Sequence, residues 1–149
     1  MIRALLPLAF AASVAAAQKV PPELATLANK AKLGGPVSAW CHAEFQSGHP
    51  GAFAVAVTAS SGGRYLALDA DGTATELGLF RRSAELSCYG RREAEKLDGS
   101  IRQSATVHGH ITPRWDTTVV CGFLEDTIAE CWQYSPKERM FIKVGQWIT

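Results

Sequence analysis

The stretch Cys121-Gly-Phe-Leu-Glu-Asp-Thr-Ile-Ala-Glu-Cys131 has a polar triplet at its centre and a cysteine at each end. Its flanks read as two β-strands, and the triplet at 125–127 is typical of a turn. With a three-residue loop at 125–127, Leu124 faces Ile128 and Cys121 falls directly opposite Cys131. Directly paired β-carbons lie about 4.5–5.5 Å apart, so a small adjustment is enough to form a disulfide. The spacing therefore predicts a hairpin whose two strands are covalently joined.

The other two cysteines are Cys41 and Cys88. Four cysteines allow three connectivities, and sequence alone does not select one of them. We prefer Cys121 with Cys131 because of the register, and Cys41 with Cys88 then follows by elimination. The chain has no Cys-X-X-Cys motif, which a thiol redox pair, most structural zinc sites and attached haem require. We expect two structural disulfides, each contributing about 2–4 kcal/mol to stability.

The N-terminal segment has the pattern of a secretory signal peptide. Arg3 precedes an apolar run over 4–17, and alanines at positions 15 and 17 have the spacing of a cleavage site. The run is shorter than the roughly 20 apolar residues that span a bilayer, and Pro7 interrupts it. We expect residues 1–17 to be removed and the mature chain to be periplasmic or secreted, without a transmembrane anchor. Disulfides persist in such compartments.

The charges of the mature chain balance. The full sequence has 15 Lys and Arg residues against 14 Asp and Glu residues, so the loss of Arg3 leaves 14 against 14. A neutral chain has no large field of one sign to attract nucleic acid or an anionic membrane. We therefore expect no nucleic-acid partner, and the partner is an unknown protein or small ligand.

Two segments have helical spacing. In residues 18–36, Leu24, Leu27, Ala28 and Ala31 recur at helical spacing, which predicts an N-terminal helix or a mobile spacer. Residues 90–105 predict a second, internal helix for the same reason.

The remaining segments read as strands. Residues 52–58 alternate, with Phe53, Val55 and Val57 on one face and alanines on the other. Residues 63–80 predict two strands joined by a tight turn at Asp71-Gly72. Further strands are predicted at 84–89, 117–124, 127–134 and 140–148. This order predicts a single α+β domain over 37–149, built on an antiparallel β-sheet of hairpin-linked strands with the internal helix and the N-terminal helix.

Candidate functional residues are few. Phe141, Lys143 and Trp147 alternate in the last predicted strand and form a possible binding surface, although such aromatic residues also commonly fill a core. Two further residues, His108 and His110, share one face of a strand and are weak candidates for metal ligands. A third ligand is not identified by the sequence, and the available candidates are His42, His49 and Asp116.

Signals for catalysis are missing from the sequence. Asp69 to Gly72 begins like a calcium loop but lacks the later acidic ligands, so a hairpin turn is the better interpretation. No Gly-X-Ser-X-Gly motif is present, and four bridged cysteines leave no thiolate nucleophile. We expect no cofactor. The leading hypothesis is a small exported, disulfide-stabilised domain that acts as a non-catalytic binding or interaction module. The alternative is a small extracytoplasmic hydrolase or metal-binding protein that uses His108 and His110.

Overall fold

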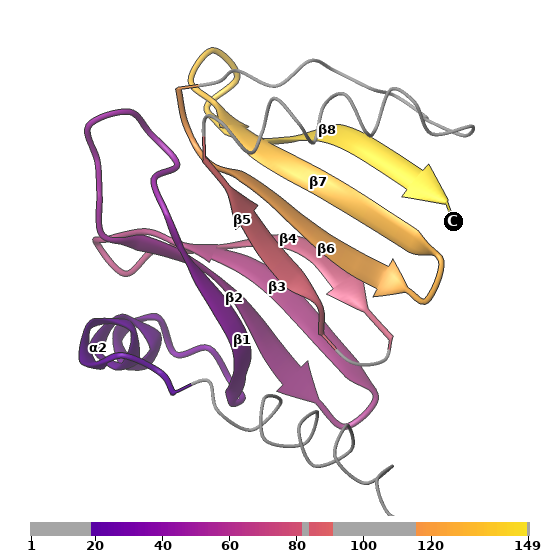
Figure 1. Ribbon diagram of the computed structural model, residues 1–149. Helices are drawn as coiled ribbons and strands as arrows, with labels where there is room; N and C mark the ends of the chain where they lie inside the picture. Colours follow the sequence, from indigo (N-terminus) through magenta and orange to yellow (C-terminus); the bar gives the residue numbers. More distant parts are fainter. Residues whose placement is uncertain (1–18, 82–83, 91–115, 149) are drawn as a thin grey trace, which may run out of the picture.

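The computed structural model describes residues 19–81, 84–90 and 116–148, with no side chains given for the last two of these positions. The strands form two four-stranded antiparallel sheets that lie against one another (Figure 1). Sheet A has the order β1-β2-β3-β4 and comprises β1 (Val37–Ala43), β2 (Ala52–Ala59), β3 (Gly62–Leu68) and β4 (Ala74–Phe80). Sheet B has the order β5-β6-β7-β8 and comprises β5 (Leu86–Tyr89), β6 (Val119–Glu125), β7 (Ile128–Ser135) and β8 (Met140–Ile148).

The division into two sheets differs from the single sheet that the sequence predicts. Antiparallel pairing is confirmed throughout the described strands, but β4 and β5 belong to different sheets. Strand β1 was not predicted at all. A two-residue period shows which segments are strands and which faces are apolar, but it does not show which strands pair.

The alternation of β2 separates two layers of the core. Phe53, Val55 and Val57 point towards the short helix α2 (Pro22–Ala31), which contributes the fully buried Leu24. The alanines of β2 point the other way, into the space between the sheets. Because alanine side chains are short, sheet B can approach β2 closely, and the larger rings that fill the interior come from other strands.

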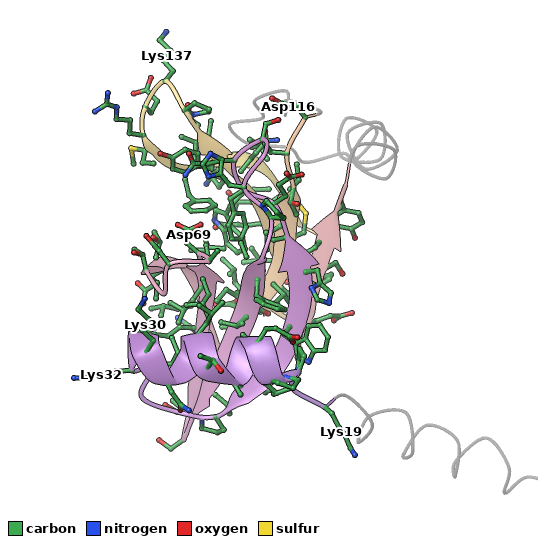
Figure 2. All side chains as sticks on the ribbon, turned by 90° about the vertical axis from the view of Figure 1, so that its left-hand side faces the viewer. Lys19, Lys30, Lys32, Asp69, Asp116 and Lys137 are labelled. Carbon is green, nitrogen blue, oxygen red and sulfur yellow. A yellow bond between two sulfur atoms is a disulfide. The ribbon has the colours of Figure 1, made fainter. Side chains whose placement is uncertain are left out.

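Helix α2 covers the outer face of sheet A (Figure 2). Pro22 at its first turn has no backbone N–H to leave unsatisfied, and the helix ends at Lys32, which has a left-handed backbone with φ of 54°. Arg64 of β3 then donates a hydrogen bond from Nη2 to the Leu33 carbonyl oxygen at 2.6 Å. This contact attaches the C-terminal end of the helix to the sheet, where a positive charge also complements the helix dipole.

Tyr65 connects the two sheets at the centre of the core. Its ring packs against Phe80 and Trp132, with centroid distances of 4.8 and 6.0 Å. Its hydroxyl donates to the carbonyl oxygen of Phe123 at 2.7 Å and accepts from the backbone N–H of Glu85 at 3.0 Å. A side chain from sheet A thus hydrogen-bonds to the backbone of sheet B.

The predicted register of the β6–β7 hairpin is confirmed at its cysteines. Cys121 pairs with Cys131, and Val120 pairs with Trp132. The predicted loop is wrong by one residue, because Ile128 pairs with Glu125 rather than with Leu124. A β-bulge between positions 123 and 125 absorbs the difference and leaves the register beyond it unchanged.

Both predicted disulfides are present, and no described cysteine is free. Cys121–Cys131 joins directly paired residues with a Cα–Cα distance of 4.0 Å. Cys41–Cys88 joins β1 of sheet A to β5 of sheet B with a Cα–Cα distance of 5.9 Å. The first bond therefore reinforces one hairpin, and the second ties the two sheets together.

Several predictions lie outside the described residues: the signal peptide at 1–17, the helix at 90–105, and the histidine pair at 108 and 110. Within the part of the chain that the structure describes, no helix is long and apolar enough to cross a membrane.

Candidate functional site

The two sheets are offset, and among the described strands the offset leaves part of sheet B without a facing strand. Sheet A approaches sheet B chiefly through β1 with β5 and β4 with β6. Between β4 and β6, the backbone N–H of Arg81 donates to the carbonyl oxygen of Leu124 at 3.0 Å. Strands β7 and β8 extend beyond this margin (Figure 1). Their inner face therefore continues past the edge of sheet A.

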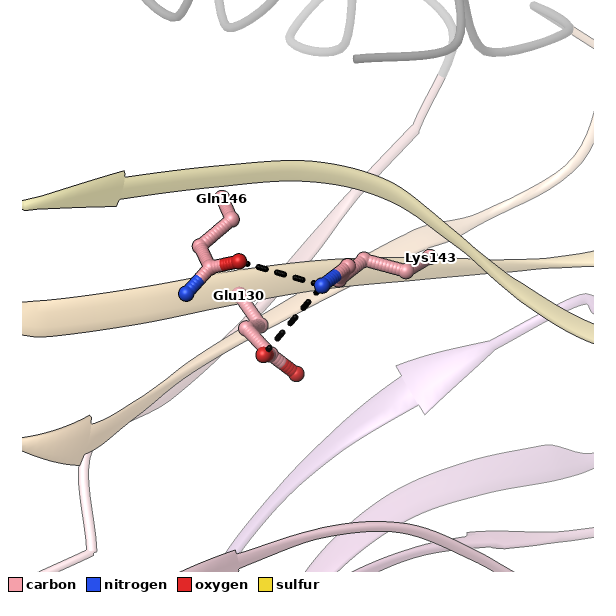
Figure 3. Close-up of polar contacts among 3 residues, drawn as sticks. All are labelled: Glu130, Lys143 and Gln146. Atoms are coloured by element: carbon pink, nitrogen blue, oxygen red, sulfur yellow. Dashed lines mark hydrogen bonds and ion pairs between the residues drawn. The ribbon is translucent and has the colours of Figure 1, made fainter. Parts of the chain in front are cut away.

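Three polar side chains meet on this inner face, and we call them the β7–β8 shelf: Glu130, Lys143 and Gln146 (Figure 3). The Nζ of Lys143 donates to Oε1 of Gln146 at 3.0 Å and lies 3.7 Å from Oε1 of Glu130. The Lys143 side chain is 41% exposed, whereas that of Glu130 is 18% exposed. A partly exposed ion pair contributes only about 0–1 kcal/mol to stability, so the fold gains little from this cluster.

The register explains why the three polar residues converge. Glu130 pairs with Gln146, and Trp132 pairs with Lys143, so all of these positions lie on the same face of sheet B. One residue of β8, Val144, is inserted between the two pairs as a β-bulge. The bulge bends β8 locally, and the side chain of Lys143 reaches along the strand to Gln146.

An apolar wall borders the shelf on the side of sheet A. Trp132 is 4% exposed, and its indole lies over Gly78 of β4, where an added β-carbon would be 2.8 Å from Cζ2. Leu124 is the next neighbour of the same glycine. The shelf is therefore a charged surface beside a buried apolar contact between the two sheets. The side chain of Lys143 makes the shelf accessible to water.

Two of the three residues of the predicted binding surface on β8, Phe141 and Lys143, have described side chains. Phe141 packs against Phe45 and Tyr134, with ring centroids 5.0 and 5.4 Å apart. Lys143 belongs to the shelf. The backbone of position 147 pairs with Ala129. Of Phe141 and Lys143, whose side chains the structure describes, Lys143 is the more exposed.

A concavity lies at the C-terminal end of β4. It has a volume of about 510 Å³, and its lining includes Arg64, Leu79, Arg81 and Glu125. Arg81 Nε lies 3.3 Å from Glu125 Oε1, and Arg64 binds the Leu33 carbonyl oxygen. Both guanidinium groups thus have partners within the fold.

The candidates for a third metal ligand, His42, His49 and Asp116, lie among the described residues, whereas His108 and His110 do not. His42 packs against Phe53 and edge-on against Trp40, with ring centroids 5.0 and 5.3 Å apart. His49 lies near Asp69. Burial raises the pKa of Asp69, and the electrostatic effect of His49 lowers it in part. Over 19–81, 84–90 and 116–148, no three His, Cys, Asp or Glu residues are grouped as a metal site requires.

The Asp69–Gly72 segment forms the hairpin turn between β3 and β4. The Asp71 carboxylate accepts a hydrogen bond from the Thr73 backbone N–H at 2.8 Å, and this bond lowers the pKa of Asp71. Gly72 has a φ of 90°, which a residue with a β-carbon rarely adopts. The carboxylate of Asp71 is thus used within the turn itself.

Sequence reasoning identified Lys143 and missed Gln146. The signal that would have revealed Gln146 is its pairing with Glu130, and this pairing depends on the bulge at Val144. No protein family, curated protein or solved structure matches this chain at a significant level, so the site rests on its own geometry.

Proposed function

We propose that this protein is a non-catalytic binding module that acts outside the cytoplasm and holds its ligand on the β7–β8 shelf. The observation that carries the proposal is the offset of the sheets, which leaves the accessible Lys143 on strands beyond the edge of sheet A. Two disulfides support the proposed location, because such bonds are retained in oxidising compartments.

A rigid platform is consistent with binding. One disulfide fixes the β6–β7 hairpin that carries Glu130, and the other joins the sheets at their opposite margin. The shelf residues therefore sit on strands that are ordered before a ligand arrives. Such preorganisation reduces the entropy lost on association.

The proposal is tested by a photo-crosslinking amino acid placed at position 143 in the organism that produces the protein. Lys137, which projects from the tip of the β7–β8 turn, is the matched control because it is an exposed lysine of the same hairpin (Figure 2). We expect a discrete adduct from position 143 and none from position 137. Equal adducts at both positions, or none at either, would contradict the proposal.

The alternative that uses His108 and His110 is tested separately. We expect that the purified mature protein carries no stoichiometric metal and that replacing both histidines with alanine leaves ligand binding unchanged. Bound zinc or copper that is lost in the double variant would favour the metal-dependent alternative.

A further inference from the structure

Within the described part of the chain, the outer edge of β8 has no neighbouring strand. Among the strands that the structure describes, β8 pairs only with β7, and at nine residues it is the longest. In an antiparallel ladder, alternate residues direct their backbone N–H and C=O groups away from the neighbouring strand. An edge of this length therefore presents several hydrogen-bonding groups for an added strand.

Two features of β8 discourage indiscriminate pairing. The bulge at Val144 interrupts the regular ladder, and Lys143 places a positive charge next to the edge. Lysines and bulges at sheet edges oppose aggregation. The same lysine favours a strand with an acidic residue opposite it and disfavours a strand with a basic one.

The polar contacts of Lys143 leave room for an additional acceptor. An ammonium group has three donors, and the described partners of Nζ are Gln146 at 3.0 Å and Glu130 at 3.7 Å. A carboxylate on an added strand could reach the Lys143 side chain, which is 41% exposed. The approaching acid would not need to displace Gln146.

We infer that the ligand is an extended polypeptide segment that pairs with the edge of β8 and places an acidic side chain beside Lys143. The inference rests on the proposed function and specifies its ligand. Phe141 lies two residues before Lys143 on the same face and packs against Phe45 and Tyr134. The segment therefore carries an apolar residue two positions from its acidic residue, because neighbouring strands share one side-chain period.

The test uses phage-displayed random heptapeptides selected on the mature protein with both disulfides intact. We expect the selected peptides to share an acidic residue two positions from an apolar one. The variant Lys143→Glu should weaken the selected peptides by about fivefold to tenfold, which is the effect of reversing a cross-strand charge pair. The control Lys137→Glu makes the same charge change at the hairpin tip and should leave their affinity unchanged.

Backbone pairing is tested on the peptide, which avoids any risk of misfolding the protein. A single N-methyl group is introduced at each successive position of a selected peptide. We expect loss of binding at alternate positions only, because an added strand directs every second N–H towards β8.

Four outcomes overturn the inference. Selected peptides could bind the Lys143→Glu and Lys137→Glu variants equally, or tolerate N-methylation at every position. The library could also yield no binder. Finally, the unliganded protein could form a dimer that Lys143→Glu dissociates, in which case a second copy of the chain occupies β8. A crosslinked ligand at position 143 would in any of these cases preserve the proposed function while the strand inference fails.

Discussion

The ring of Tyr65 lies directly over the backbone of Gly122, so that a β-carbon at position 122 would be 2.7 Å from Cε2 of the tyrosine. Tyr65 belongs to sheet A and Gly122 to sheet B. The glycine thus allows the sheets to approach closely enough for the tyrosine hydroxyl to reach the backbone of Phe123. This contact brings the two layers close together at their centre.

Replacing Gly122 with alanine should destabilise the protein by about 1–3 kcal/mol, because the added methyl group overlaps a buried ring. Urea unfolding with both disulfides intact measures the effect. The cost should fall markedly in a Tyr65→Leu background, since the two positions share the contact. An equal cost in both backgrounds would show that the tyrosine ring is not responsible.

Replacing Tyr65 with phenylalanine should cost about 1–3 kcal/mol, because it leaves the backbone N–H of Glu85 and the carbonyl oxygen of Phe123 without the hydroxyl partner. The ring and its contacts with Phe80 and Trp132 are retained in this variant. Equilibrium unfolding in denaturant measures the difference. A cost below about 0.5 kcal/mol would indicate that other groups or water replace these bonds.

The stability of the protein should also fall at high pH through Tyr65. Burial raises the pKa of this phenol above its ordinary value of 10.0. The unfolded chain therefore ionises first, and the contribution of Tyr65 is complete below pH 10 and is lost as the pH rises through the raised value. Denaturant unfolding between pH 8 and about pH 11 measures the trend. Lysines titrate in the same range, so Tyr65→Phe is the reference and should show a shallower decline.

Removing the Cys41–Cys88 bond should destabilise the protein more than removing the Cys121–Cys131 bond. The sequence separations are 47 and 10 residues, for which loop-closure entropy predicts about 4 and about 2.7 kcal/mol. The disulfide that closes the longer loop also connects two sheets, whereas the disulfide that closes the shorter loop joins residues that are already paired. Unfolding of the two paired Cys→Ser variants tests the order, and the reverse order would show that local register energy outweighs loop closure.

The maturation prediction is checked by intact mass before and after reduction and alkylation. We expect the exported protein to lack residues 1–17 and to accept four alkyl groups only after reduction. Alkylation of the native protein, or a cytoplasmic protein that still carries the N-terminal segment, would contradict the predicted compartment.

The hairpin between β6 and β7 shows how far sequence reasoning reaches. Its register was predictable because strand pairing and a short loop place Cys121 opposite Cys131. The bulge at Leu124 was not predictable, because inserting one residue costs little locally and depends on the packing of that side chain towards Gly78. The bulge at Val144 is of the same kind, and it decides which residues join Lys143 on the shelf.

The sequence by itself determined the described strands other than β1, the apolar faces of β2 and the pairing of Cys121 with Cys131, because side-chain period and short-range cysteine spacing are local properties of the chain. Only the tertiary structure decided that the strands form two offset sheets and that Glu130, Lys143 and Gln146 meet. Those outcomes depend on contacts between distant segments, such as the ring of Tyr65 over Gly122 and the indole of Trp132 over Gly78. Glycine has no side chain, so the sequence pattern does not indicate such a contact. Its role is evident only from the position of the ring that covers it.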